Sequence, residues 1–327
     1  MDYSVRKEDF PNIEEQWRSL LPQCTTNAIF LTPQWQRTWQ QVFLNDRELL
    51  TLTVYCGKQL VGIAPLMREG NRLSLLGSSD VCDFLDFVIA DGHGPAAAQA
   101  LLDYFPSLEW DTLDLQPLLP SSTTLTHFVP LAKEKGYAVE LTQMDVCPGV
   151  DLPPTWEEYL GLLAGKDRHE LRRKMRRLST KAQVDLRKAD DISLLHEDMS
   201  AFLQLFNQSR DEKARFMTPQ MVRFFWALAT TMAEAGYLRL FFLVVDGDQV
   251  ATAMGFDYQN SFYLYNSGYD PDHSSLGVGF LLKALCLKES IVTGKKRFEF
   301  LRGAEDYKYR LGGQDIPVYQ ALIRNKT

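Results

Sequence analysis

The sequence predicts an α/β fold with mixed sheets, arranged as two tandem copies of one domain. The first sign is a near-repeat, because FLTPQ at residues 30–34 returns as FMTPQ at residues 216–220, an offset of 186. In each half an apolar segment, a glycine turn (Gly57 or Gly247) and a second apolar segment follow. Residues 110–115 then correspond to residues 297–302, an offset of 187. Three matches in one order indicate a tandem duplication, so we expect two packed domains with their site in the interdomain cleft.

The elements of each half follow from apolar periodicity and from start and stop signals. Thr32 and Thr218 each precede a proline, which predicts a capped helix beginning at that proline. Gly136 and Gly236 suit the residue after a helix end. In the first half we expect helices at 8–21, 33–43, 96–105 and 121–136, and strands at 49–55, 60–67, 73–76, 84–89, 111–115 and 137–141. In the second half we expect helices at 192–208, 219–236 and 278–291, a short helix after 301, and strands at 184–187, 238–245, 250–258, 262–268, 298–301 and 317–323.

A stretch with several prolines and a glycine, residues 147–154, marks the boundary between the halves. We therefore expect a first domain at 1–150, a linker with a basic helix at 151–182, and a second domain at 183–327. Thr155-x-x-Glu158 and Asp167-x-x-Glu170 have the form of capping boxes, which predicts that each opens a helix.

Composition excludes several classes of protein. The chain has 327 residues, enough for two domains, and its 45% apolar and 24% charged residues are ordinary for a globular protein. No apolar run approaches the roughly 20 residues that span a bilayer, and residues 1–10 lack the apolar region of a secretory signal. The five cysteines and five histidines are scattered, so we expect no disulfide framework and no metal. A cytoplasmic protein, with a monomer as the simplest state, fits these properties.

The charge is unevenly distributed. Residues 166–188 carry ten Lys or Arg and three acids, a net charge of +7, whereas the whole chain carries −7. This basic segment, which includes Arg172, has three interpretations: a charged connecting helix, a site for the phosphates of a donor or a tRNA, or a docking surface for an anionic membrane.

The sharpest local motif is a glycine turn between a strand and an apolar helix. It comprises Ser274, Leu276, Gly277, Val278 and Gly279. Two glycines allow close approach of a ligand to the backbone, and the start of a helix offers free N–H groups to an anion such as a pyrophosphate. A tight turn at a helix start is the alternative.

Several segments together closely resemble the CelD/FemAB-like branch of the GNAT N-acyltransferase superfamily. They are residues 61–66, 81–86, 166–174, 262–271 and 301–312, besides the glycine turn. The resemblance extends from about residue 30 to residue 323. In the superfamily the turn is usually Gln/Arg-x-x-Gly-x-Gly/Ala, so Ser274 departs from it at the first position.

The resemblance implies two GNAT domains in one chain, with acetyl-CoA or another acyl-CoA as donor substrate at the turn of the second domain. The first domain would be structural or bind the acceptor. The implied reaction is direct attack of an amine or hydroxyl on the thioester, without a covalent enzyme intermediate. Relatives include FemAB peptidyltransferases, which use aminoacyl-tRNA, and acetyltransferases linked to cellulose or exopolysaccharide synthesis. The long helical arm of the FemAB proteins is absent from this sequence.

Three residues are candidates for proton transfer. Tyr269 and Asp270 lie at the end of a strand, where functional side chains collect. Glu299 lies on a strand after the apolar helix, where an acid is costly unless paired. It is therefore either a base or a member of an ion pair.

The candidate substrate-binding residues are Asp83, Asp86, Arg172, Arg302, Lys308 and Arg310. Of the two aspartates, we expect one to orient the acceptor and the other to cap a turn. For Lys308 the resemblance implies contact with an anionic substrate group, and the alternative is a surface lysine paired with Glu305 or Asp306. The two arginines can grip phosphate or carboxylate, or balance nearby acids.

These observations predict a GNAT-type acyltransferase acting on a small-molecule, glycan or peptide-precursor acceptor, with a link to exopolysaccharide, cellulose or cell-envelope metabolism. Two alternatives stay open. One is an aminoacyl-tRNA-dependent peptidyltransferase, and the other is a non-catalytic binding factor for envelope biosynthesis.

Overall fold

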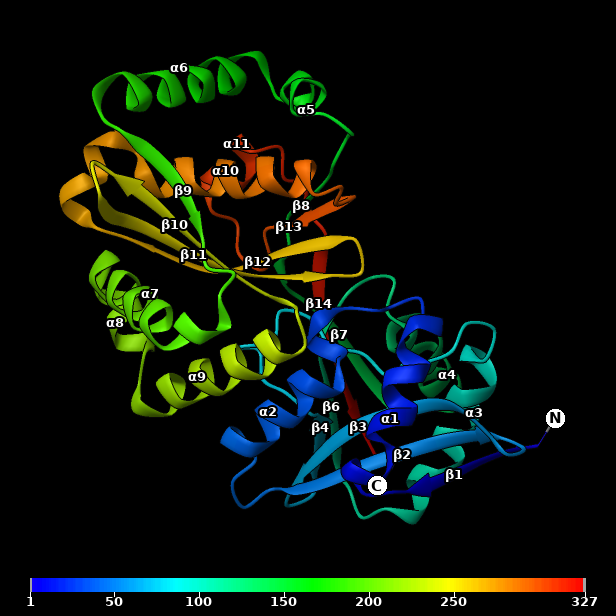
Figure 1. The fold of residues 1–327 in the computed structure, drawn as a ribbon. Helices are drawn as coiled ribbons and strands as arrows, with labels where there is room; N and C mark the ends of the chain where they lie inside the picture. The colour runs from blue at the N-terminus through cyan, green and yellow to red at the C-terminus, as the bar shows by residue number, and fades with distance from the viewer. Residues whose placement is uncertain (1, 326–327) are drawn as a thin grey trace. The chain divides into compact units, whose positions relative to one another are not determined.

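A computed structural model describes residues 2–325 and divides the chain into two compact units (Figure 1). The first unit takes the residues up to Val146 and those from Ile316 onward, and the second is Cys147–Asp315. Each unit is built around a mixed sheet of its own. The predicted α/β class with two mixed sheets is therefore confirmed.

The first unit contains an eight-stranded sheet. Its strands are β1 (Tyr3–Lys7), β2 (Glu48–Cys56), β3 (Gln59–Glu69), β4 (Arg72–Leu75), β5 (Val88–Ile89), β6 (Thr112–Leu118), β7 (Ala138–Val146) and β14 (Pro317–Arg324). Its α-helices are α1 (Phe10–Leu20), α2 (Pro33–Phe43), α3 (Gly94–Tyr104) and α4 (Val129–Glu134). The strand order is β1-β2-β3-β4-β6-β14-β7, and β5 pairs with β3.

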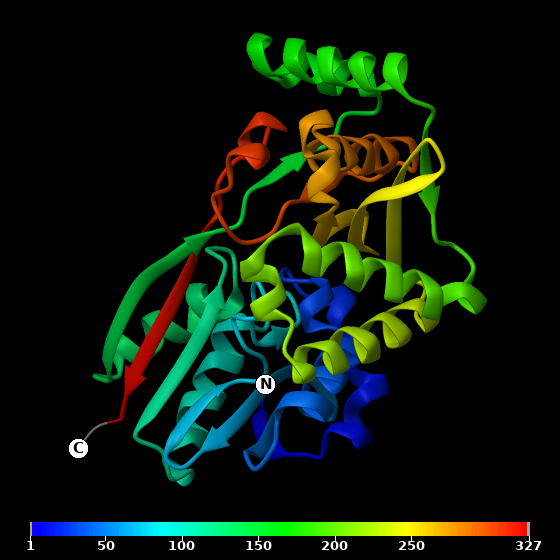
Figure 2. The ribbon, with the colours of Figure 1, turned by 90° about the vertical axis from the view of Figure 1, so that its left-hand side faces the viewer.

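The second unit contains a six-stranded sheet in the order β8-β13-β12-β11-β10-β9. The strands are β8 (Gly149–Asp151), β9 (Val184–Lys188), β10 (Leu238–Val245), β11 (Asp248–Tyr258), β12 (Ser261–Tyr269) and β13 (Arg297–Glu299). The α-helices are α5 (Trp156–Leu162), α6 (Gly165–Lys181), α7 (Leu195–Ser209), α8 (Asp211–Phe216), α9 (Pro219–Glu234), α10 (Val278–Val292) and α11 (Asp306–Arg310). Helix α10 covers one face of the sheet, α7 and α9 cover the other, and α6 lies outside α10 (Figures 1 and 2).

The repeated features of the sequence form matching structures in the two units. Thr32 and Thr218 both cap their helices, accepting a hydrogen bond at 3.3 Å from the N–H of Trp35 and of Met221. The hairpins β2/β3 and β10/β11 follow these helices. Each unit then has one parallel strand pair, β4 with β6 and β12 with β13.

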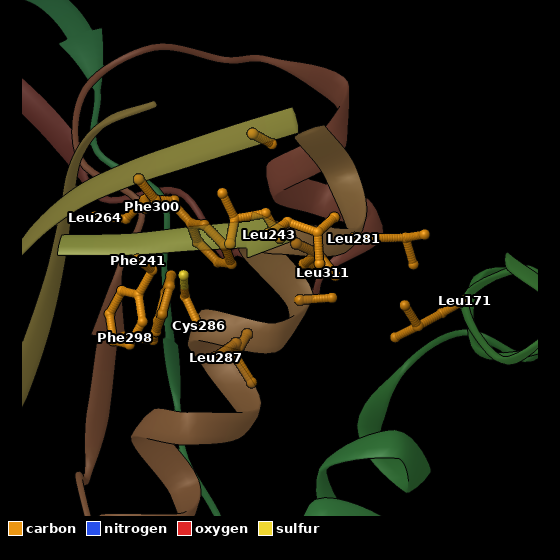
Figure 3. Packing of buried hydrophobic residues seen from close by; sticks show 14 of the residues in the cluster. Leu171, Phe241, Leu243, Leu264, Leu281, Cys286, Leu287, Phe298, Phe300 and Leu311 are labelled. Atoms are coloured by element: carbon orange, nitrogen blue, oxygen red, sulfur yellow. The ribbon is translucent and has the colours of Figure 1, made fainter. Parts of the chain in front are cut away.

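The main core of the second unit lies between the sheet and α10 (Figure 3). Phe241 and Leu243 from β10 meet Leu281 and Leu287 from α10. Leu171 of α6 joins the same core, so the basic helix is anchored by one apolar stripe.

The structure corrects three expectations about local elements. The strand expected at 84–89 is reduced to β5, and α6 begins at Gly165, so Asp167 is in its first turn instead of capping it. The last strand, β14, pairs with β6 and β7 of the first sheet, although the sequence places it with the second half. In its place β8, from the stretch expected to be a linker, pairs with β13. Apolar alternation identifies a strand but carries no information about the sheet edge that it joins.

No helix among residues 2–325 is long and apolar enough to cross a membrane.

The assignment of β14 to the first sheet predicts which unit is destabilised when a charged residue is introduced into this strand. Ala321 on β14 and Ala251 on β11 are both fully buried in strand interiors. We expect Ala321→Asp and Ala251→Asp each to destabilise its own unit by more than about 2 kcal/mol, because an unpaired carboxylate loses its hydration. Hydrogen exchange should show faster exchange in β6 and β7 for the first variant and in β10 and β12 for the second. Faster exchange in the second sheet for Ala321→Asp would contradict the assignment.

Candidate active site

A wedge opens where two neighbouring strands of the second sheet diverge. Strand β12 pairs with β11 along its length to Tyr269, but with β13 only through Ser261, Phe262 and Tyr263. Beyond Tyr263, the β13 side of β12 (residues 264–269) faces no strand in the described part of the chain. An unpaired strand edge presents N–H and C=O groups to which an extended ligand can add.

A β-bulge lies at the start of this divergence. In the β11–β12 ladder Met254 pairs with Asn266 and Gly255 pairs with Leu264, so Tyr265 is the extra residue. A bulge bends its strand and increases the local twist. Gly255 is required opposite it, since a Cβ there would lie 2.7 Å from the Tyr263 carbonyl oxygen.

The predicted glycine turn stands at the mouth of this wedge. A 3₁₀ helix, Pro271–Leu276, connects β12 to Gly277, which has a left-handed backbone (φ +72°), and α10 starts at the next residue. The N–H groups of Phe280 and Leu281 both bond to the Gly277 carbonyl, so those of Val278 and Gly279 have no acceptor within the helix. The Tyr269 ring packs on Gly279, where a Cβ would lie 3.1 Å from it.

A lysine of the basic helix lies over this turn. A Cβ built on Gly277 would be 3.4 Å from Lys174 Nζ, and the same ammonium lies 3.5 Å from a Glu170 carboxylate oxygen. The turn therefore combines free N–H groups at a helix start with a positive charge from α6, an arrangement suited to a phosphate-bearing ligand.

The inner wall of the wedge carries two lysines. Lys213 of α8 donates to the carbonyl of Ser267 on the unpaired edge of β12. Lys283 of α10 donates to the Gly279 carbonyl at 3.1 Å and lies 4.6 Å from the centroid of the Tyr307 ring. Burial, reinforced by neighbouring cations, lowers the pKa of Lys213 to about 8 and that of Lys283 to about 7.

The loop after β13 is held by Lys308, which the sequence assigned to substrate binding or to a surface ion pair. Lys308 is 1% exposed, and its ammonium donates to the carbonyls of Leu301, Arg302 and Gly303 at 2.7, 2.7 and 2.9 Å. Glu305 pairs with it at 2.9 Å. An ammonium has three donors, and those of Lys308 are engaged by three carbonyls of this loop. The expected pairing with Glu305 is present, but the side chain is buried and not on the surface.

Tyr269 ends β12 at the wedge, as the sequence suggested, whereas Asp270 has structural bonds. Asp270 caps the 3₁₀ helix by accepting from the Asp272 N–H at 3.0 Å, and its other oxygen lies 3.0 Å from His273 Nδ1.

Glu299 is in an ion pair, one of the two alternatives that the sequence left open. Arg297 Nε donates to it at 2.7 Å, and Arg297 Nη1 donates to Asp151 on β8 at 2.8 Å. Burial raises the pKa of the Glu299 carboxyl, and Arg297 opposes the rise.

The two candidate aspartates, Asp83 and Asp86, belong to the first unit. Asp86 is completely buried and accepts from the N–H groups of Phe87, Thr123 and Thr124 at 2.8, 2.7 and 2.9 Å. It therefore organises two loops of its own unit, which fits the turn-capping role that the sequence allowed for one of the two aspartates; burial raises the pKa of its carboxyl. Asp83 is half-buried in the preceding segment.

The arginines occupy three places. Arg172 is exposed on α6 and pairs with Glu157 at 2.6 Å. Arg302 lies in the loop that Lys308 holds, and Arg310 stacks 4.9 Å from the Phe280 ring centroid, beside the turn. Arg310 also lines a surface hollow between α6 and α11, 3.5 Å from Asp167.

Sequence reasoning did not select Lys174, Lys213 or Lys283. For Lys174 a signal existed, because it falls between Leu171 and Leu178 at helical spacing and so on the inward stripe. No local signal distinguishes Lys213 and Lys283 from surface lysines, since only the tertiary fold brings them together.

Residues 165–309 match the model of the acetyltransferase (GNAT) domain family. This part of the chain is therefore a GNAT domain, a family match that supports transferase activity. Within residues 2–325, no group of three or more His, Cys, Asp or Glu residues is arranged to hold a metal ion.

Solved structures share the fold over nearly the whole chain. FemX superposes with a TM-score of 0.69 at 10% identity, covering 98% of this chain and 97% of FemX. The C-terminal domain of a putative lysylphosphatidylglycerol synthetase from Agrobacterium fabrum gives 0.60 at 10% identity, with 97% and 92% covered. A tandem GNAT protein from the clavulanic acid biosynthesis pathway gives 0.51 at 12% identity, with 100% of both chains covered. The predicted tandem GNAT fold is thus confirmed. A search of curated protein sequences finds no match.

The position of Lys308 predicts a stability effect. Lys308→Met leaves three loop carbonyls without their donor, so we expect a loss of about 3 kcal/mol in urea unfolding. Lys296→Met, at an exposed lysine of the same unit, should change stability by less than about 0.5 kcal/mol. A Lys308→Met protein as stable as the wild type would contradict this structural role and favour a role of the ammonium in ligand binding.

Proposed function

We propose that this protein is an acyltransferase that moves an acetyl group from acetyl-CoA to an amine or hydroxyl acceptor. The observation that carries the proposal is the wedge between β12 and β13, which opens directly beside the Gly277 turn of a GNAT domain. The second unit would bind the donor, and the first would be structural or bind the acceptor.

The parts of the wedge have distinct roles in this proposal. The N–H groups of Val278 and Gly279 bind the donor pyrophosphate with the Lys174 ammonium, and Ser274 and Leu276 border the turn. The amide-bearing arm of the donor adds to the free edge of β12 as an extra strand. Direct attack on the thioester then needs mainly proximity and orientation of the two substrates.

Proton donation to the departing thiolate is assigned to Tyr269, which ends the β12 edge against Gly279. Asp270 and Glu299 act by holding the 3₁₀ helix and β13 in place, since both are engaged in the contacts described above. Arg302 and Arg310 flank the loop and the turn, where an anionic part of a substrate would approach. The proposed link to polysaccharide or cell-envelope metabolism, and the cytoplasmic location, rest on the sequence resemblance alone.

Calorimetric titration with acetyl-CoA tests the proposal. We expect micromolar binding, about −8 kcal/mol, which Gly277→Trp abolishes by filling the turn. Gly161→Trp, at an open and exposed position of α5, should leave binding unchanged. Lys174→Met should weaken binding about 10-fold by removing one charge-assisted contact, whereas Lys181→Met at the far end of α6 should not. No binding at millimolar acetyl-CoA would refute the proposal.

A second candidate uses aminoacyl-tRNA as the donor. The observation in its favour is the exposed side of α6, where Lys166, Arg176, Arg177 and Lys181 have no ion-pair partner within the described residues. It predicts RNA binding that weakens steeply with salt. Reversing the charge of Arg176 and Arg177 together should then abolish RNA binding in a gel-shift titration and leave acetyl-CoA binding unaffected.

A further inference from the structure

Lys283 is placed inside the wedge by two contacts. Its ammonium nitrogen lies 3.1 Å from the Gly279 carbonyl, one turn along α10, and 4.6 Å from the centroid of the Tyr307 ring on α11. These partners belong to the glycine turn and to the segment after β13, which bound the wedge on two sides. The side chain is half-buried.

The charged groups near Lys283 shift its pKa in both directions. Lys213 and Arg210, cations on the α7–α8 side, lower it, whereas Cys286 on α10 itself and the exposed carboxylate of Glu305 raise it. No carboxylate among residues 2–325 is within salt-bridge distance of Lys283, unlike Lys308, which has Glu305. Burial, and then Lys213, lower the pKa of Lys283 to about 7, so a large part of it is neutral amine near neutral pH.

A neutral amine has a lone pair that an ion-paired lysine lacks. The Gly279 carbonyl accepts one N–H and leaves that lone pair free. A group titrating near the working pH is best suited to general acid–base catalysis. Tyr307 and Glu299, also beside the wedge, have raised pKa values, and Glu299 is bonded to Arg297.

We propose that Lys283 accepts the proton that the acceptor nucleophile loses during acyl transfer. As the acceptor nitrogen or oxygen bonds to the thioester carbon, its proton moves to Lys283 Nζ and the carbon–sulfur bond breaks. The sulfur leaves as a thiolate and then takes up the proton held by Lys283, either directly or relayed through the Tyr269 hydroxyl, which completes free CoA and restores the neutral amine. This inference rests on the proposed function and assigns a catalytic residue within it.

Competitive labelling with acetic anhydride measures the amine directly and needs no acceptor. Labelling of each lysine between about pH 5 and about pH 10, read by mass spectrometry, should give Lys283 an apparent pKa of about 7, well below the usual range of a lysine. Added CoA should shield Lys283 from the reagent and leave Lys296 unaffected. If calorimetry shows that the protein binds CoA, an ordinary lysine pKa at Lys283, or no shielding of Lys283 by CoA, would overturn this inference and leave the proposed function standing. No CoA binding at all would overturn the proposed function with it.

The proton-accepting role is tested by release of CoA from acetyl-CoA with hydroxylamine as the probe acceptor. Wild type should show a rate that falls below about pH 7 as Lys283 becomes protonated. Lys283→Arg, which is always charged, and Lys283→Met should each lower the rate about 100-fold and remove the fall in rate below about pH 7. Their affinity for acetyl-CoA should change only a few-fold. Lys288→Met, on the side of α10 toward Trp156, is the matched control and should behave as wild type. A Lys283→Arg protein as fast as wild type, or a wild type that binds acetyl-CoA but does not accelerate this reaction, would overturn the proposal.

Discussion

The separation of β12 from β13 is the constraint on which the rest of the second unit depends. The two strands pair through only three residues, and the bulge at Tyr265 bends β12 where the pairing ends. Unpaired strand edges inside a fold are costly unless other groups bond to them or a ligand covers them. Here Lys213 bonds to the Ser267 carbonyl, and residues 264–269 have no other strand on this side within residues 2–325.

The charged side chains around the wedge fall into those held in structural ion pairs and those near the glycine turn. Lys308 is fully committed to three carbonyls and Glu305, and Glu299 is paired with Arg297, so these residues form the frame. Lys174 of α6 and Lys283 of α10 both contact the glycine turn. A cation near phosphates gains from staying charged, whereas a crowded amine beside a thioester is more useful neutral. In the proposed reaction, the short segment from Tyr269 to Lys283 would therefore serve both binding and chemistry.

The sequence predicted those features that depend on a few neighbouring residues, such as helix caps and turns. The caps at Thr32 and Thr218, the two hairpins and the glycine turn before α10 all follow from a few neighbouring residues, and the structure has them. It did not predict that β14 joins the first sheet, because pairing between distant strands leaves no local trace. For Lys308 the resemblance implied contact with a substrate, and Asp86 was expected to orient the acceptor or cap a turn. Only the tertiary structure reveals that both side chains are buried and hold loops. Lys213 and Lys283 lie 70 positions apart and become neighbours only in the folded unit.

Backbone hydrogen exchange with and without acetyl-CoA tests the central claim, that the wedge of the second unit is the donor site. The account predicts slower exchange at Val278, Gly279 and those N–H groups of residues 264–269 that point away from β11, because the ligand bonds to groups that have no partner in the helix or in the sheet. The first unit, including the start of α3 at Gly94, should exchange unchanged. Protection confined to the first unit, or none at the turn and the β12 edge when acetyl-CoA is bound, would contradict it.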